Sequence, residues 1–482
     1  METKINYLIS LVFITLFSFN TNFLFSQTVN NIEGIWVGDL IINENVKLSM
    51  AFEITENEEK SFLAIMHSLD QGAFDINVEE INFDGKNINM TINSLNSIFS
   101  GKIETNDSIS GGMTQGKNKP WQLCLNKVDK LPIAKPQRPQ EPKQPLSYYV
   151  EDITFNNEIA GVTIAGTFTR PKKDGKYPVV LLITGSGPND RDESIFGHKV
   201  FLVWADILTN AGIAVLRVDD RGVGESTGSF HEADNRDLAD DVVAGVNYLK
   251  TRNDIDVKRI GLIGHSLGAD IAPIAAVKSN DVKFVVLMAG SAIPLNETIY
   301  EQCKIAYPQI GVSEFGVELN HKINVAGFEI VRTESNDSIA RIKIAEKMAT
   351  FNSDVEKLNE KDKKILELSV PLNPKDFYYW LKPNHKFDLF YNPYDDLSKL
   401  KCPVLALNGD KDSQVLPQNL KGIEKALIDA GNTNYTIKLF ENKNHLFQTC
   451  KTGSIEEYGE IKETVDQEVM EFVIDWIKTV KN

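Results

Sequence analysis

Six short apolar runs dominate the sequence after Tyr148, and stretches with helical periodicity separate them. In chain order the runs read YPVVLLITG, IAVLRVDD, RIGLIGH, KFVVLMAG, CPVLALNG and YTIKLFENKN. Runs of this length with few polar interruptions are typical of parallel β-strands that helices cover on both faces. The alternation of such strands with helices predicts an α/β fold built on an open, mostly parallel sheet over residues 148–482.

Helical periodicity is clearest at residues 200–211, 237–250, 420–430 and 465–480. The alternation with strands fails only between Ala292 and about Leu400, in a charged stretch whose pattern is mostly helical. Because two expected core strands flank this stretch, we expect an insertion at about 292–400 that lies over the carboxyl edge of the sheet. Ligands of open α/β sheets bind at that edge, so the insertion is a candidate cap.

Residues 32–128 show a different pattern, in which apolar and polar positions alternate, most clearly at residues 48–54. Asp84-Gly85 separates two alternating runs and predicts a two-residue hairpin turn. Several short strands at this spacing predict a small all-β barrel or sandwich. Trp36 and Trp121 are expected in its core rather than on a sugar-binding platform.

A proline-rich segment at 129–147 follows, with five prolines among charged and polar residues. Such a segment cannot build a core and favours extended polyproline II structure, which predicts a linker between the two parts of the chain.

Residues 1–26 have the pattern of a secretory signal peptide. Lys4 lies in a short polar start, an apolar core runs from Tyr7 to Phe19, and Ser26 precedes Gln27. Polar residues at 20–22 interrupt the core before it reaches the ~20 residues that a membrane span needs. We therefore expect a secreted or periplasmic protein with no membrane span after signal cleavage.

The composition excludes several classes of function. The 482-residue chain has a formal net charge of −16 and no dense block of Lys or Arg, which argues against nucleic acid as a partner. Its four cysteines are far apart and form no CxxC pair, so the sequence indicates neither a zinc site nor a dense disulfide framework. A single disulfide stays open at this point, as does the oligomeric state.

The pentapeptide Gly264-His265-Ser266-Leu267-Gly268 has the form G-x-S-x-G. A serine on a sharp turn from strand to helix needs small residues two positions away on each side, because the backbone is strained and the helix packs closely. The same residues also occur in ordinary tight turns, so the pentapeptide alone is a weak signal. Here an apolar strand precedes it and the helical pattern LGADIAPIAAV follows it. This context predicts that Ser266 is a nucleophile.

A nucleophilic serine needs a base and an acid that orients the base. Of the seven histidines, only His445 follows the last predicted strand, which is the expected place for the base. Asp410 and Asp412 both follow the preceding strand. We favour Asp412 as the acid because a residue a few positions past the strand end can turn back toward the histidine, whereas Asp410 lies in the tight turn.

The reaction also needs two N–H donors for the oxyanion that forms. The first is expected to be Leu267 N–H, at the start of the helix after the nucleophile. The second is expected in the glycine-rich loop after the strand YPVVLLITG, with Ser186 as first choice. The alternative is that the glycines of this loop only form a turn.

Six motifs in order, TGSGPNDRDE, GHKVF, RVDDRGVGESTG, GHSLGA, LNGDKDSQV and NHLFQ, resemble the α/β-hydrolase superfamily. The similarity is to an exported bacterial esterase branch related to serine aminopeptidase-like (S33-type) hydrolases, over residues 148–482. The resemblance implies Ser266 as nucleophile, Asp412 as acid and His445 as base. It also implies hydrolysis of carboxylic esters, often with short acyl chains, and a β-rich N-terminal domain.

Two positions depart from that pattern. Thr184 stands where many relatives have a histidine, which bears on the second oxyanion donor. Leu267-Gly268-Ala269 stands where this branch often has an acidic residue followed by two glycines, which implies a different pocket wall. Similar hydrolases use the DxRGxG loop mainly as a brace below the site, so Arg221 is expected to pair with nearby acids rather than with substrate.

The sequence as a whole predicts an exported serine hydrolase that acts on a small ester through an acyl-enzyme and needs no metal or organic cofactor. An aminopeptidase or amidase is the first alternative, and an acidic group in the insertion that binds a substrate amine would favour it. Glu318, Glu329 and Glu346 are available for that purpose. The second alternative is a non-catalytic protein that binds a polysaccharide or a protein partner through the same scaffold.

Overall fold

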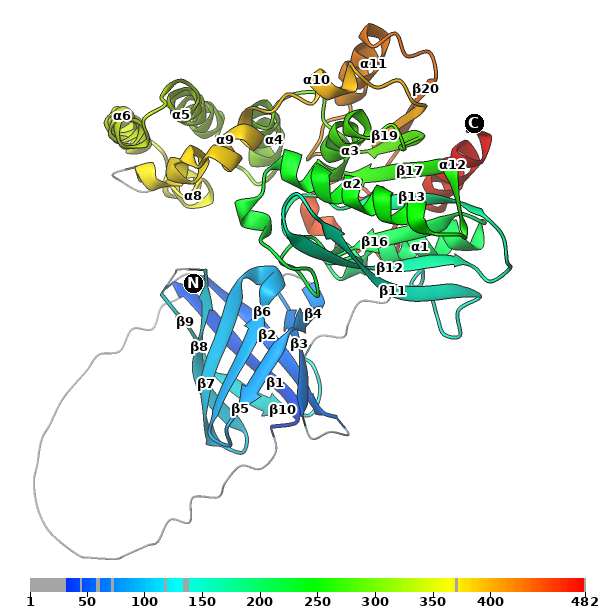
Figure 1. Cartoon of the computed structure of the whole chain (residues 1–482). Coiled ribbons are helices and arrows are strands. Elements are labelled where there is room, and N and C mark those ends of the chain that lie inside the picture. Colours follow the sequence, from blue (N-terminus) through cyan, green and yellow to red (C-terminus); the bar gives the residue numbers. More distant parts are fainter. Residues whose placement is uncertain are drawn as a thin grey trace, which may run out of the picture.

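The computed structural model describes residues 32–43, 46–57, 61–70, 73–116, 119–132, 138–368 and 372–480. Within these residues the strands form a ten-stranded sheet, an eight-stranded sheet and a two-stranded ribbon. Figure 1 shows the ten-stranded sheet below the α/β part of the chain. The expected signal peptide at 1–26 lies outside the described residues. No helix in the described part of the chain is both long enough and apolar enough to cross a membrane.

The N-terminal sheet is antiparallel throughout, and its order is β4-β3-β2-β1-β10-β8-β7-β6-β5, with β9 paired to β1 and β8. The sheet is curled (Figure 1). Its core contains Trp36, Phe52 and Phe99, which confirms the expectation for Trp36, whereas Trp121 is only partly buried and packs against this core. The strands are β1 (Gly34–Asn43), β2 (Val46–Glu56), β3 (Phe62–Ser68), β4 (Ala73–Val78), β5 (Glu80–Phe83), β6 (Asn87–Ile92), β7 (Ser97–Thr105), β8 (Ser108–Gln115), β9 (Trp121–Leu123) and β10 (Leu125–Val128).

The hairpin at Asp84-Gly85 differs from the prediction. Phe83 pairs with Ile88, and Asp84 N–H donates to Asn87 O at 3.2 Å, so the two turn residues are Gly85 and Lys86, one position later than predicted. The Asp84 carboxylate accepts hydrogen bonds from the backbone N–H groups of Lys86 and Asn87. These bonds close the turn at Gly85, which has a φ of 90°.

The second sheet contains all six predicted runs as strands. Its order is β11-β12-β16-β13-β17-β18-β19-β20, antiparallel from β11 to β16 and parallel from there on, which confirms the predicted α/β sheet. The strands are β11 (Tyr148–Asn157), β12 (Val162–Pro171), β13 (Tyr177–Ile183), β16 (Ala214–Val218), β17 (Ile255–His265), β18 (Phe284–Met288), β19 (Val404–Gly409) and β20 (Tyr435–Phe440). The ribbon pairs β14 (Ser194–Ile195) with β15 (His198–Lys199).

Helices cover both faces of this sheet because successive strand residues point to opposite sides. On β13, Val179 and Leu181 belong to the core on the face that α2 (Asn235–Thr251), α3 (Leu267–Lys278) and α11 (Asn419–Asp429) cover. Val180 and Leu182 pack under α1 (Val200–Asn210) and α12 (Gln467–Thr479) on the other face. A continuous apolar run is therefore what each central strand requires.

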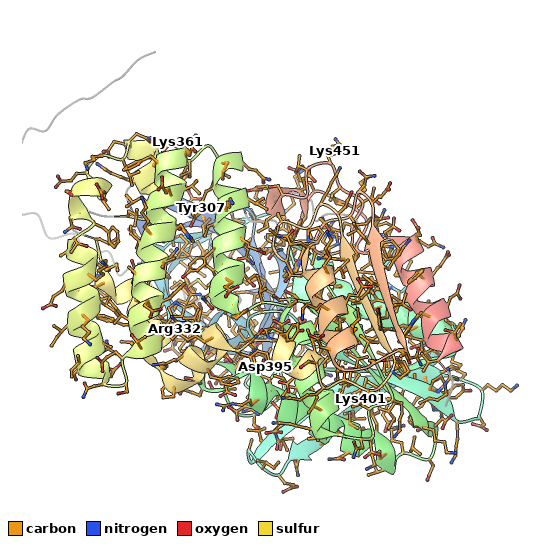
Figure 2. All side chains as sticks on the ribbon, turned by 90° about the horizontal axis from the view of Figure 1, so that it is seen from above. Tyr307, Arg332, Lys361, Asp395, Lys401 and Lys451 are labelled. Atoms are coloured by element: carbon orange, nitrogen blue, oxygen red, sulfur yellow. The ribbon has the colours of Figure 1, made fainter. Side chains whose placement is uncertain are left out.

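The chain between β18 and β19 is helical in its described residues. It forms α4 (Leu295–Gln309), α5 (Glu314–Thr333), α6 (Asp337–Ala349), α7 (Asn352–Val355), α8 (Glu360–Ile365), a 3₁₀ segment (Pro374–Leu381), α9 (Pro383–Phe390) and α10 (Tyr394–Leu397). The helices α4 to α9, which we call the helical layer, surround a core of their own that includes Phe328, Phe377 and Leu389. Figure 2 views this layer from above, with Tyr307 of α4 and Arg332 of α5 labelled beside the sheet.

Part of the proline-rich segment is held in place. The Arg138 guanidinium donates hydrogen bonds of 2.9–3.0 Å to the carbonyl oxygens of Phe196, Gly197, Gly459 and Ile461. The Gln140 side chain bonds the backbone at Thr464 and Val465. From Arg138 onward this segment is therefore fixed to the α/β part rather than free of contacts.

Candidate active site

Ser266 lies on a strained turn between β17 and α3. Its φ of 55° and ψ of −119° are a conformation that residues with a side chain rarely adopt. The Ser266 N–H donates to Met288 O at 2.9 Å, which fixes the turn to the end of β18. Both glycines of the motif lack space for a side chain. A Cβ at Gly264 would lie 2.1 Å from Gly268 O, and one at Gly268 would lie 2.1 Å from Ile183 O.

Asp412 and His445 are joined directly. The Asp412 carboxylate is 3% exposed, and its Oδ2 lies 2.8 Å from His445 Nδ1, whose N–H donates to it. The other carboxylate oxygen accepts from the backbone N–H groups of Gln414 and Val415. Asp410 is exposed. Of the two candidate acids, Asp412 is thus the one that contacts the candidate base.

The loop that carries His445 is fixed by its own hydrogen bonds. The Asn444 side chain accepts from the backbone N–H groups of Leu446 and Gln448 and donates to the Gln448 side chain. A Cβ at Gly409 would lie 2.2 Å from Lys443 O, so this loop packs against the turn before Asp412 at a distance that only glycine allows. His445 itself is 4% exposed.

The serine and the histidine come together less directly. Among the described residues, the Ser266 hydroxyl makes no hydrogen bond with His445. The two are brought near each other through His265, whose Nε2 lies 3.0 Å from His445 O and whose ring centroid is 5.0 Å from that of His445. Hydrogen bonds between nucleophile and base are often long before substrate binds, so this geometry is compatible with a Ser–His pair.

The glycine-rich loop lies against the serine. A Cβ at Gly185 would lie 3.4 Å from Ser266 Cβ. Gly185 N–H donates to the Glu193 carboxylate at 2.8 Å and is therefore occupied. Neither Ser186 N–H nor Leu267 N–H, the two predicted oxyanion donors, donates to another described residue. Leu267 is the first residue of α3, where the helix dipole favours negative charge.

Asn189 shapes this loop and had not been identified from the sequence. Its side-chain amide lies 2.9–3.3 Å from the carbonyl oxygens of Gly185, Ser186 and Gly187. Its backbone N–H donates to the Asp220 carboxylate, which also accepts from the Thr184 hydroxyl at 2.9 Å. Thr184 therefore supports the loop through Asp220.

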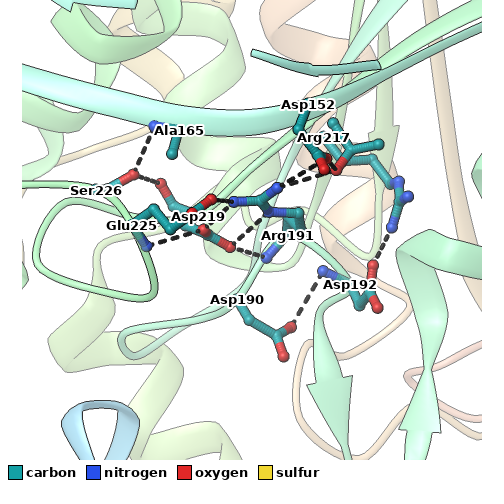
Figure 3. A network of polar contacts seen from close by, with 10 residues as sticks. Asp152, Ala165, Asp190, Arg191, Asp192, Arg217, Asp219, Glu225 and Ser226 are labelled. Atoms are coloured by element: carbon teal, nitrogen blue, oxygen red, sulfur yellow. Dashed lines mark hydrogen bonds and ion pairs between the residues drawn. The ribbon is translucent and has the colours of Figure 1, made fainter. Parts of the chain in front are cut away.

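Polar contacts below the loop involve the DxRGxG motif. Figure 3 shows the Arg191 guanidinium bonded to the Asp219 carboxylate, with Nη2 and Oδ2 2.6 Å apart. The Arg221 guanidinium bonds the Asp241 carboxylate at 2.6 and 2.8 Å. The pairing of Arg221 with a nearby acid agrees with the bracing role expected for this motif.

His198 is buried between Thr464 and the Tyr458 carbonyl, and burial lowers the pKa of its imidazole to about 4, so it is a neutral structural residue. All four cysteines are free thiols. Glu193 and His265 had not been identified as site residues, because nothing in their sequence context distinguishes them from other polar residues near the motif.

Two family models match the sequence. The model described as X-Pro dipeptidyl-peptidase (S15 family) matches residues 160–426, and the dienelactone hydrolase family model matches residues 389–481. Ser266 lies in the first stretch, His445 in the second, and Asp412 in both. Neither description names the S33-type branch, so that finer placement stays a prediction.

Several known proteins are similar to the chain. Esterase EstD of Thermotoga maritima is 28% identical over 334 residues, which cover 69% of this chain and 68% of that protein. An uncharacterised 31.7 kDa protein of Escherichia coli is 26% identical over 289 residues, 55% of this chain and 82% of that protein. A solved esterase structure from Pyrococcus furiosus aligns at 18% identity with a TM-score of 0.42, covering 72% of this chain and 98% of that one.

The family assignment follows from the extent of the match to the X-Pro dipeptidyl-peptidase (S15) model, residues 160–426. It covers more than half of the chain and includes β12 to β19 with the turn at Ser266. The chain belongs to the X-Pro dipeptidyl-peptidase (S15) family and is a member of the α/β-hydrolase superfamily.

Proposed function

We propose that the protein is a serine hydrolase that cleaves carboxylic esters, with Ser266 as nucleophile, His445 as base and Asp412 as the orienting acid. The observation that carries the proposal is the Ser266 turn, because a serine with a φ of 55° between a strand and a helix is a strained arrangement that a structural turn does not require. The hydrogen bond between Asp412 and His445 at the same sheet edge supports it. The similarity to esterase EstD supports the ester as substrate.

The chemistry follows the order of an acyl transfer. Ser266 Oγ attacks the ester carbonyl while His445 Nε2 accepts its proton, and Asp412 holds His445 Nδ1–H in the required tautomer. Leu267 N–H and Ser186 N–H donate to the oxyanion. His445 returns the proton to the leaving alcohol, and water then releases the acyl group by the same steps in reverse.

The helical layer is the proposed cap over this site. The Gln302 side chain on α4 donates to Gln414 O at 2.7 Å, two residues past Asp412, so α4 is attached to the acid loop. A cavity of about 580 Å³ lies along α4 and α5, and its apolar wall includes Tyr300, Val312 and Val317. Its lining residues all belong to the helical layer, and Ser266, Asp412 and His445 are not among them. Short acyl chains and export remain part of the proposal that the sequence supports.

A peptidase is the second candidate, and the cavity contains the observation in its favour. One carboxylate oxygen of Glu301 is buried with no hydrogen-bond partner among the described residues, and Glu301 lines the cavity. Glu318 also lines it but is paired with Lys322 at 2.6 Å, and Glu329 is paired with Arg332. Glu301 thus has a carboxylate oxygen available for an amine, whereas Glu318 and Glu329 are paired with basic side chains, which fits the S15 family description.

The experiment compares wild-type protein with Ser266→Ala. Both are incubated with a fluorophosphonate probe, with p-nitrophenyl acetate, and with aminoacyl and Xaa-Pro p-nitroanilides. We expect wild-type labelling and ester cleavage that are lost in the variant, with slower or absent anilide cleavage. Faster anilide than ester cleavage would establish the peptidase instead. A folded wild type that neither reacts with the probe nor cleaves any substrate would contradict both and favour the binding protein.

A further inference from the structure

His265 occupies the first variable position of the serine motif, yet it makes two hydrogen bonds in a buried site. It is the last residue of β17 and is 4% exposed. Its Nε2 lies 3.0 Å from His445 O, and its Nδ1 lies 2.9 Å from Glu193 Oε1. Both ring nitrogens are therefore in use, one on the loop of the base and the other on a carboxylate.

Glu193 connects His265 to the glycine-rich loop. It is 3% exposed, and its Oε1 accepts from Gly185 N–H at 2.8 Å as well as facing His265. Its backbone φ of 48° is unusual for a residue with a side chain, so the chain accepts local strain to place this carboxylate. Its other carboxylate oxygen is buried with no partner among the described residues.

The contacts define the charge state of this pair. A carbonyl oxygen only accepts, so Nε2 of His265 carries a hydrogen toward His445 O, and Nδ1 faces a carboxylate oxygen that already accepts from Gly185. Burial by itself lowers the pKa of His265. The charge and hydrogen bond of Glu193, together with His445 O and Asp412, outweigh that effect and hold its pKa above the ordinary value. A raised pKa favours the protonated imidazole, which can donate from both ring nitrogens.

Resting on the function proposed above, we propose that Glu193 and His265 are positioning residues, which together fix the glycine-rich loop and the His445 loop on either side of Ser266. The path runs from Gly185 N–H through Glu193 and His265 to His445 O, and each step is a hydrogen bond of 2.8–3.0 Å between buried groups. Neither residue touches the reacting atoms. Their role is to set the distance between the oxyanion donors and the base.

A purely structural role is the alternative, and the two differ in what they predict. Buried ion pairs often add little net stability, and breaking one leaves an uncompensated charge. A structural pair would lower thermal stability when broken and leave the turnover of the remaining folded protein unchanged. A positioning pair would also lower kcat, because a misplacement of about 1 Å in a catalytic group can reduce the rate by about 100-fold.

The test uses Glu193→Gln, His265→Gln and the double variant of the full chain. Turnover of p-nitrophenyl acetate and the rate of fluorophosphonate labelling are measured below the melting temperature of each protein. We expect each single variant to lose about 100-fold in kcat with KM within about twofold, and labelling to slow in parallel. The double variant should be no slower than the slower single variant, because both changes break the same path.

His265→Leu and Glu193→Asp keep the test decisive if a variant does not fold. Gln at 265 retains a donor for His445 O and leucine does not, so His265→Gln should be faster than His265→Leu. Asp254→Asn is the matched control, since it breaks the ion pairs with Arg170 and Arg252 just before the start of β17, away from Ser266. It should lower the melting temperature and leave kcat unchanged.

Two results would overturn the proposal. Folded Glu193 and His265 variants with wild-type kcat would reduce the pair to a stabilising contact. Losses that multiply in the double variant would show that the two residues act independently and not through one path. A folded wild type without ester cleavage or probe labelling is a different result, because it removes the proposed hydrolase itself and the positioning role with it.

Discussion

At Asp412 both carboxylate oxygens are in use, one on two backbone N–H groups and the other on His445 Nδ1–H. This arrangement leaves the carboxylate one orientation and the imidazole one tautomer, with Nε2 free to accept a proton. Asp410 lies two residues away, exposed, and has no such role. The roles of Asp410 and Asp412 can therefore be compared by substituting each side chain alone.

We predict that Asp412→Asn lowers kcat for p-nitrophenyl acetate by about 10³–10⁴-fold with a small change in KM, because an amide can hold His445 in the wrong tautomer. Asp410→Asn is the matched control and should stay within about twofold of wild type. Steady-state kinetics of the two purified variants decide the matter. A larger loss in Asp410→Asn than in Asp412→Asn would show that the acid has been assigned to the wrong residue.

The sequence was sufficient to place Ser266, Asp412 and His445 after the ends of β17, β19 and β20, because the order of elements restricts the choice there. Their catalytic roles stay a proposal. The sequence was not sufficient for Glu193. Its hydrogen-bond partner His265 is 72 positions away, and their contact depends on the path of a loop with positive φ values. Local pattern carries no information about such a path.

Among the elements, the loop after β13 depends most on buried charge. The Asp220 carboxylate holds it through Thr184 and Asn189, and burial raises the pKa of Asp220 to about 8, with the nearby carboxylates of Glu193 and Asp241 adding to the effect. A carboxyl whose pKa is higher in the folded chain than in the unfolded chain binds protons more tightly when folded. Its contribution to stability therefore falls as the pH rises from about 4 to about 8 and levels off above that.

We predict that Asp220→Asn removes this pH-dependent loss. The melting temperature of the variant, measured relative to wild type, should increase steadily from pH 5 to pH 8 and stay constant at higher pH. Differential scanning fluorimetry of both proteins across this range gives the comparison. A difference that stays flat over the whole range would mean that Asp220 has an ordinary pKa in the folded protein.

Most helices and strands of the α/β part could be predicted because the apolar periodicity and the helix-capping residues indicate the same elements. The helix expected at 237–250 is α2 (Asn235–Thr251), and it begins where the Asp234 carboxylate accepts from the N–H groups of Arg236 and Asp237. The hairpin at Asp84 could not be predicted to the residue. There the Asp84 side chain accepts from the N–H groups of Lys86 and Asn87, and the turn lies one residue later than the Asp-Gly pair suggests.

At the scale of the molecule, Arg138 is the point where the chain leaves the proline-rich segment and joins the α/β part. Its guanidinium binds four carbonyl oxygens from two loops, at residues 196–197 and 459–461. Burial lowers the pKa of Arg138 below its ordinary value. Because the ordinary pKa of an arginine side chain is very high, the guanidinium stays charged. The two loops are thus held together by one side chain from outside the sheet.

We predict that Arg138→Ala lowers the free energy of unfolding of the α/β part by about 2 kcal/mol, since charge-assisted hydrogen bonds are lost. Arg138→Lys keeps the charge but not the fork of donors, so its loss should be smaller. Urea unfolding followed by tryptophan fluorescence measures both. Equal stability of all three proteins would show that the four contacts contribute nothing.

The apolar cores described above are separate from one another. Among the residues that the structure describes, Trp36 belongs to a cluster of the N-terminal sheet, and Phe328 and Phe377 belong to a cluster of the helical layer. Cooperative melting requires a shared core, so calorimetry of this chain should resolve more than one heat-absorption peak. Each substitution would then shift the peak of its own unit, and the heat trace itself would map where in the chain a residue exerts its effect.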